Sequence, residues 1–218
     1  MKKWGSLLVI FILIIIITSP LWIWYLKPKN PWRIRVVDMT APHPNYREHE
    51  SLFWVFKHNK VMVPGEDRLF REDVDYIGYY PELSNYEQRR FTTRRLTRED
   101  LVGIDMLYLS DAYGVYVNDY EGYHGEEWVA HLDFSRLIFG GFHDEESQII
   151  EAFSQSGRTV VGEFNSFAEP THMSARNRLQ KLFGLEWSGW AGRFFEDLAD
   201  TKYSVPHWAP RLWRIHYG

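Results

Sequence analysis

Three carboxylates occur where the chain leaves a short apolar run. Asp38 ends the run Arg33-Ile-Arg-Val-Val, Asp111 ends Met106-Leu-Tyr-Leu-Ser, and Glu163 follows Thr159-Val-Val-Gly. Carboxyl groups that lie close together raise one another's pKa, which suits acid/base catalysis, and they also bind hard cations. We predict that Glu163 is the catalytic acid/base, with Asp111 or Asp38 as its partner or as the group that orients the ligand. Alternatively, each acid caps the helix after it or pairs with a nearby arginine.

Other polar and aromatic residues accompany these acids as candidates for ligand binding. They are Asn165, Tyr113, His49, Thr171, His172, Trp190 and Arg193. His49 lies between two glutamates at the start of a predicted helix, where an imidazole can relay protons, bind a ligand or simply belong to the helix terminus. Trp190 and Arg193 either wall a cleft or pack over the edge of the sheet.

Several kinds of site are excluded or only weakly indicated. The chain has no cysteine, which excludes disulfides, a thiolate zinc site and a cysteine nucleophile. No second histidine follows His49 at the spacing of a zinc helix, so we predict no metal or other cofactor, although a divalent cation between the carboxylates stays open. Ser166 ends Gly162-Glu-Phe-Asn-Ser, which is not the Gly-x-Ser-x-Gly sequence of a serine hydrolase.

The elements that must position these residues alternate between helix and strand. Residues 144–157 begin with acids and end with glycine, as a helix does. Residues 158–162 are rich in β-branched side chains and predict a short buried strand, and residues 174–184 predict a second amphipathic helix. This order is typical of a parallel α/β sheet, whose strands end at one shared edge where ligands bind.

The rest of the chain extends this pattern. We predict strands at residues 33–38, 74–80 and 105–111, a brief strand or turn at 137–141, and a further strand with a glycine-containing turn at 185–193. We also predict a helix at 47–59, a solvated loop at 83–95 and a lid or binding loop at 117–135.

Residues 4–26 form an uncharged, isoleucine- and leucine-rich run. A bilayer core requires about 20 apolar residues, so this run predicts a membrane-spanning helix that inserts in the lipid bilayer. A cleaved signal peptide is the alternative, but Thr18-Ser19-Pro20 is a poor cleavage site. We therefore expect an uncleaved anchor.

The orientation of the anchor is less directly indicated. More basic residues follow the run than precede it, and the positive-inside rule alone would keep the domain in the cytoplasm. A very short N-terminal tail before a long domain is instead typical of a signal anchor. We expect a single-pass protein of the cell membrane with an extracytoplasmic domain.

Composition narrows the partners. The net charge of −4 offers no basic surface for nucleic acid, which we exclude as a partner. The aromatic content of 17% supplies rings for a core and also for the walls of a cleft, of the kind that carbohydrate sites use.

The segment Asp105-Met-Leu-Tyr-Leu-Ser-Asp-Ala-Tyr-Gly114, followed by Gly140-Gly141 and Gly157-Arg-Thr-Val-Val-Gly-Glu163, resembles the class I glutamine amidotransferase-like superfamily, in particular its ThuA-like and other non-amidotransferase branches. The resemblance covers roughly residues 33–195 and implies a flavodoxin-like parallel sheet sandwiched by helices, with a site near Asp111, Glu163 and Asn165. Phe164 occupies the place of the family's catalytic cysteine, so glutaminase activity is not implied. The combination with an anchor resembles uncharacterised bacterial envelope proteins.

The expected organisation follows from these features. It consists of a short tail (residues 1–3), the anchor (4–26), a tether (27–32), the amidotransferase-like domain (33–200) and an aromatic C-terminal segment (201–218), after which the native chain could continue. We expect the domain to bind a carbohydrate-like ligand of the envelope and, if it is an enzyme, to process that ligand by carboxylate chemistry. The alternative is an inactive scaffold that binds an envelope protein.

Overall fold

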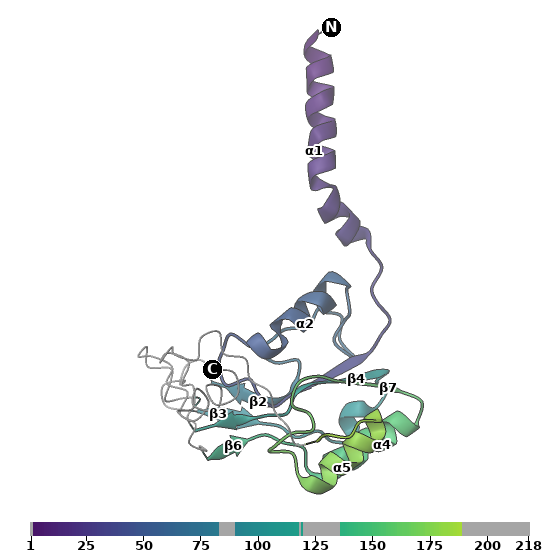
Figure 1. The fold of residues 1–218 in the computed structure, drawn as a ribbon. Helices are drawn as coiled ribbons and strands as arrows, with labels where there is room; N and C mark the ends of the chain where they lie inside the picture. Colours follow the sequence, from purple (N-terminus) through teal and green to yellow (C-terminus); the bar gives the residue numbers. More distant parts are fainter. Residues whose placement is uncertain (1, 83–89, 118, 120–135, 189–218) are drawn as a thin grey trace, which may run out of the picture.

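The computed structural model describes residues 2–82, 90–117, 119 and 136–188, and the fold is α/β with one long N-terminal helix (Figure 1). The helices are α1 (Lys2–Leu26), α2 (Arg47–His58), the short 3₁₀ helix η2 (Glu99–Leu101), α4 (Asp144–Gln155) and α5 (Met173–Phe183). The strands are β1 (Ile34–Asp38), β2 (Ile77–Pro81), β3 (Phe91–Thr93), β4 (Met106–Asp111), β5 (Val115–Tyr116), β6 (Leu137–Phe139) and β7 (Thr159–Gly162).

Helix α1 projects away from the rest of the molecule (Figure 1). Its segment Leu7–Leu26 has a mean hydropathy of 2.7 and is not buried by protein, so it is long and apolar enough to cross a membrane. Pro20 lies inside the helix and has no N–H to give to the carbonyl of Ile16. The hydroxyl of Ser19 donates to that oxygen instead, at 2.7 Å, which keeps it satisfied in an apolar environment.

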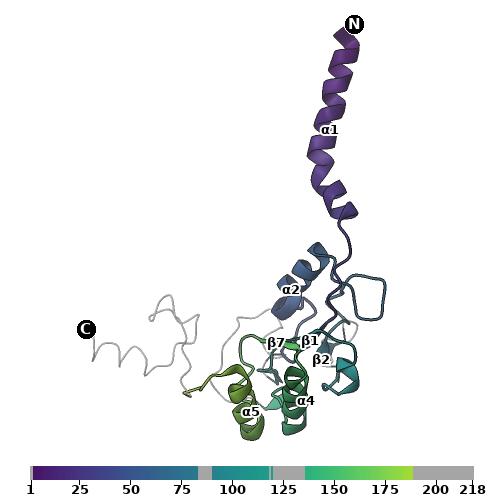
Figure 2. The same cartoon turned by 90° about the vertical axis from the view of Figure 1, so that its right-hand side faces the viewer.

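The main sheet has the order β3-β2-β1-β4-β7. Within this sheet the β1–β2, β1–β4 and β4–β7 pairs are parallel, and β3 is antiparallel to its neighbour β2, whereas β5 and β6 form a separate antiparallel pair. Helix α2 covers one face of this sheet, and α4 and α5 cover the other (Figures 1 and 2). The predicted α/β class with a mostly parallel sheet between helices is therefore confirmed.

Each face of the sheet has its own core, because side chains alternate along a strand. Val36 of β1 packs with Phe53 and Phe56 of α2, whereas the next residue, Val37, packs on the opposite face with Ile150 of α4 and Leu179 of α5. The strands β1 and β4 lie in the middle of the sheet and are buried by helices on both sides, which explains why their sequences are nearly continuous apolar runs.

Three predictions about individual elements were wrong. The strand predicted as buried, β7, is the last strand of the described sheet, with Thr159 and Gly162 exposed and Val160 and Val161 half-buried. The predicted loop at residues 83–95 contains β3, which pairs with β2 although all three of its residues are exposed. The described part of the strand predicted at residues 185–193, residues 185–188, is not a strand. The predictions for residues 120–135, 189–193 and 201–218 lie outside the described residues.

Candidate functional site

The sheet changes its direction of winding between β1 and β4. From β1 the chain passes through α2 to β2 on one side, whereas β4 lies on the other side of β1 and leads on to β7. The loops after β1 and β4 therefore diverge, and they leave a crevice at the carboxyl ends of these two strands. This is the position at which open α/β sheets bind their ligands.

Backbone contacts hold the two diverging loops together at their base. The amide of Met39 donates to the carbonyl of Asp111 at 2.9 Å, and the amide of Gly114 donates to the hydroxyl of Thr40 at 2.8 Å. Gly114 has a φ of 93°, and a Cβ there would lie 2.3 Å from the carbonyl oxygen of Phe139, so only glycine fits. The loops thus form a defined floor for the crevice.

A pocket of about 310 Å³ opens above this floor. Its lining residues come from the loop after β1, the start of α2, the loop after β4, and residue 119, which follows β5. They are Thr40, Pro42, His43, Asn45, Arg47, Glu48, Tyr113, Gly114 and Asp119. The pocket thus combines an arginine, two carboxylates, an amide, a hydroxyl and an aromatic ring.

Glu48 is the most unusual group of the pocket. Its Oε2 atom is buried and lacks a hydrogen-bond partner within the described part of the chain. Burial raises the pKa of the Glu48 carboxyl, and the nearby charge of Asp38 raises it further, while a backbone hydrogen bond lowers it. A buried oxygen of this kind costs free energy unless a ligand donates to it.

Burial also favours the neutral form of two other groups in the pocket, Asp119 and His43. Burial raises the pKa of Asp119, although its Oδ2 accepts a hydrogen bond from the amide of Tyr116 at 2.5 Å. Burial lowers the pKa of His43, and the charge of Arg47 lowers it further, so this imidazole favours its neutral form. Groups with perturbed pKa values gathered in a cleft are typical of functional sites.

The loop that carries these residues contains strained backbone. Tyr46 has a φ of 49°, a left-handed conformation that is uncommon for a bulky residue, and α2 begins directly after it. Its ring is buried against His49, at a centroid distance of 5.7 Å, and against Tyr76. Such strain persists only where packing enforces it, and it concentrates at functional sites.

The predicted site residues Asp38 and His49 form a closed pair beneath the pocket. Both are almost fully buried, and His49 Nδ1 lies 2.6 Å from Asp38 Oδ2. His49 Nε2 lies 2.9 Å from the carbonyl oxygen of Glu72, which only accepts, so Nε2 carries a proton. A second proton must lie between Nδ1 and Asp38 Oδ2, so the pair is neutral as a whole. Both ring nitrogens of His49 are then engaged in hydrogen bonds within the protein.

Asp111 lies next to Asp38, as the sequence predicts. The two residues are Cα partners across β1 and β4. Burial raises the pKa of Asp111, and the charge of Asp38 raises it further, although backbone hydrogen bonds, including one from the amide of Tyr113 at 2.7 Å, lower it. Asp111 therefore lies directly behind Tyr113, which lines the pocket and is 43% exposed.

None of the three predicted acids lines the pocket, and Glu163 does not lie in the crevice between β1 and β4 with the other two. The amide of Glu163 donates to the carbonyl of Leu109 at 2.9 Å and continues the β4–β7 ladder, while its carboxylate lies near the hydroxyl of Tyr108. Burial raises the pKa of Tyr108, and the nearby carboxylate of Glu163 raises it further. Asn165 is exposed in the loop that follows, and the structure does not bring it to the pocket lining.

The other predicted ligand-binding residues lie at the far side of the same loop. Thr171 is buried, and its hydroxyl accepts from the amide of Phe142 at 3.2 Å. His172 is the exposed residue before α5, and its ring stacks on that of His143 at a centroid distance of 4.4 Å. These contacts serve to dock the start of α5 against the start of α4. Trp190 and Arg193 lie outside the described residues.

Most of the residues that line the pocket carry no sequence signal of their own. Asn45, Arg47 and Glu48 belong to a loop and helix start that the sequence predicts, and Asp119 belongs to the predicted binding loop, but no motif distinguishes them from their neighbours. Among the described residues, no group of three or more histidine, aspartate or glutamate side chains could hold a metal ion. Compared with known proteins, the chain matches no family model, no curated protein and no solved structure.

Proposed function

We propose that this chain is a membrane-anchored α/β domain that binds a small polar, carbohydrate-like ligand in the pocket between the loops after β1 and β4. The observation that carries the proposal is Glu48, which lines the pocket at the switch point of the sheet and whose buried Oε2 has no hydrogen-bond partner among the described residues. A ligand hydroxyl that donates to this oxygen would remove the cost of its burial.

The composition of the pocket favours a molecule with several hydroxyl groups. Arg47 and Asn45 supply donors, Glu48 and Asp119 supply acceptors, and Tyr113 supplies a ring that a sugar can pack against. The volume of about 310 Å³ suits a ligand at the small end of the usual range for pockets. If the site is catalytic, Glu48 replaces Glu163 as the proposed acid/base, because its raised pKa suits a general acid.

The relation to amidotransferase-like proteins belongs to this proposal. The four parallel strands have the order β2-β1-β4-β7, which corresponds to the first four strands of the flavodoxin-like order. Phe164, at the place of the family's nucleophile, has a left-handed φ of 43°, as a sharp turn after a strand requires. Both observations support a flavodoxin-like, amidotransferase-like domain that has lost glutaminase chemistry.

The proposed location is the outer side of the cell membrane. Helix α1 would cross the bilayer, and the domain would follow it across. Protease treatment of intact spheroplasts tests the orientation: we expect digestion of the domain without lysis. Digestion only after lysis would place the domain in the cytoplasm.

Ligand binding is tested with the full chain in detergent micelles. Neutral and acidic mono- and disaccharides of the envelope are titrated by calorimetry against wild type, Glu48→Gln and Glu50→Gln. Glu50 lies two residues further along α2, is exposed and does not line the pocket, so it is the matched control. We expect Glu48→Gln to lose binding and Glu50→Gln to retain it. Equal binding by all three proteins would refute the pocket.

A protein-binding scaffold is the second candidate, and one observation favours it. Phe164 is 75% exposed although its backbone is strained, which is typical of a residue that is presented to a partner. If this function holds, Phe164→Ala abolishes co-purification of a partner, whereas Glu48→Gln leaves it unchanged. The reverse pattern would favour the ligand pocket.

A further inference from the structure

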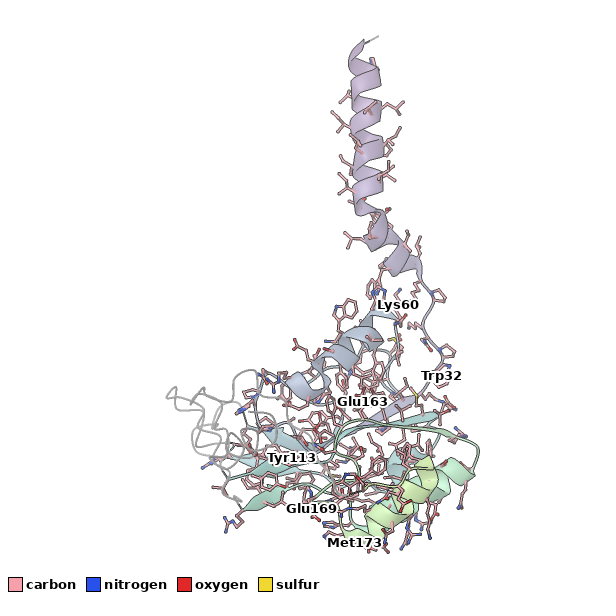
Figure 3. All side chains as sticks on the ribbon, viewed as in Figure 1. Trp32, Lys60, Tyr113, Glu163, Glu169 and Met173 are labelled. Carbon is pink, nitrogen blue, oxygen red and sulfur yellow. The ribbon has the colours of Figure 1, made fainter. Side chains whose placement is uncertain are left out.

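The end of α1 is attached to the domain by side-chain contacts and not only by the tether. The indole of Trp24 donates to the carbonyl of His58 at 3.1 Å, and Lys27 donates to Asn59 Oδ1 at 2.8 Å. Lys60 donates to the carbonyls of Tyr25 and Lys27 at 2.6 and 2.8 Å, at the base of α1 (Figure 3). These contacts fix the C-terminal end of α2 beside the last turn of α1.

Large apolar side chains are exposed next to this attachment. Trp54 is 63% exposed and Val55 is 45% exposed on the outer side of α2. The ring of Trp54 stacks on His58 at a centroid distance of 5.3 Å, and His58 is the residue whose carbonyl accepts from Trp24. Trp54 is therefore one contact away from an aromatic residue of the anchor itself.

The surroundings of these side chains match those of a lipid headgroup layer. Lys27 and Lys60 donate to neutral oxygens, so their positive charges remain available to anionic lipids. A mostly apolar pocket of about 240 Å³ lies between the tether and α2, and Val55, Trp32 and Met106 contribute to its lining. Tryptophan and lysine together are typical of residues at a membrane–water interface.

We propose that the outer face of the C-terminal half of α2, formed by Trp54, Val55 and His58, lies in the headgroup layer of the bilayer that α1 crosses. The proposal rests on the membrane anchoring proposed above. Trp24 and Tyr25, in the last turn of α1, contact His58 at the end of α2 and Lys60 just after it. Where α1 leaves the bilayer, this face of α2 therefore lies at the same depth. The domain would then have one fixed orientation on the membrane instead of swinging on its tether.

The absence of cysteine allows a direct test with single labels on the full chain. A fluorophore that is sensitive to polarity is attached to Val55→Cys, to Ile16→Cys in the middle of α1 and to Met173→Cys. Met173 is 63% exposed on α5, on the side of the domain away from α1 (Figure 3). Each protein is reconstituted in vesicles of phosphatidylglycerol and phosphatidylethanolamine, with and without lipids that carry a quencher at a defined depth.

The proposal predicts quenching of the label at residue 55 by lipids with a headgroup-level quencher, and no quenching of the label at 173. The label at 16 is expected to respond to quenchers in the acyl region. If the label at residue 16 is quenched and the label at residue 55 is not, the membrane anchoring by α1 is supported and the inference about α2 is wrong. If 16 is not quenched either, the anchoring itself fails. The label at residue 55 could also report an apolar environment that does not depend on the lipid quencher and increases with protein concentration. That result would show a second copy of the chain on this face and would also overturn the proposal.

Discussion

Replacing His49 by phenylalanine should strongly destabilise the domain, and the reason lies in Asp38. The substitution keeps a ring among Tyr46, Phe53 and Tyr76 but removes both hydrogen bonds of the imidazole. Asp38, which is fully buried, then keeps only the hydrogen bond from the amide of Thr40 at 2.8 Å among those made by the described residues. Removing one partner of a buried charged pair costs about 3–5 kcal/mol.

A conservative change at the other partner should cost much less. In Asp38→Asn the amide donates to His49 Nδ1, while Nε2 still donates to the carbonyl of Glu72, so both ring nitrogens stay satisfied. We expect a loss of about 1 kcal/mol. The double variant Asp38→Asn/His49→Phe contains no stranded charge and should recover about 2 kcal/mol relative to the sum of the single variants.

The measurement is equilibrium unfolding in urea of the full chain in micelles, followed by tryptophan fluorescence, with thermal melts in parallel. The loss expected for His49→Phe corresponds to a midpoint lowered by roughly 10 °C in a domain of this size. A loss below about 1 kcal/mol for His49→Phe, or an equal loss for Asp38→Asn, would refute the reasoning about the pair.

Three further substitutions test other parts of the structure. Gly78→Ala should cost more than about 4 kcal/mol in urea unfolding, because its Cβ would lie 1.6 Å from the carbonyl oxygen of Asp38, whereas Gly65→Ala, with no atom within 4 Å, should cost only about 1–2 kcal/mol for its left-handed φ. The pKa of Glu48 is raised above 4.5 in the folded state, so between pH 4.5 and this raised pKa the folded state binds more protons than the unfolded state. The unfolding free energy should therefore fall as the pH rises from 4.5 through the raised pKa. Glu48→Gln should flatten this part of the profile of unfolding free energy against pH. Phe164→Gly should raise the unfolding free energy by about 1 kcal/mol, because it relieves the strain of a φ of 43° in a side chain that is mostly exposed; a loss would show that the ring contributes packing.

The architecture could be predicted largely because its central strands are buried on both faces. An apolar run of five or six residues between two helical patterns is typical of a central parallel strand, and β1 and β4 follow this rule. The strand β3 does not, because Phe91-Thr-Thr is exposed and its pairing is determined by β2, a strand of different composition that is mostly buried. The edge position of β7 likewise depends on which strands lie beside it in space, and its own four residues do not encode that.

The sequence predicts where the candidate site lies but not which side chains line it. The rule that parallel strands end at one edge correctly makes Asp38 and Asp111 neighbours. It does not specify side-chain direction: His49 turns into the core, while Glu48, about 100° around the same helix, lines the pocket. Glu163 is also near a strand end, but its carboxylate lies near Tyr108 of β4 and not in the pocket lining.

The length of helix α2 sets the distance between the pocket and the end of α1. Arg47 and Glu48 at its first turn border the pocket, and the carbonyl of His58 at its last turn accepts a hydrogen bond from Trp24 of α1. Twelve residues of helix measure about 18 Å, which is less than the thickness of a bilayer core. If α1 crosses a membrane and the pocket binds a polar molecule, as proposed, the pocket would lie within about 18 Å of the end of the membrane-spanning helix, a distance that the polar head of a lipid-linked molecule can cover.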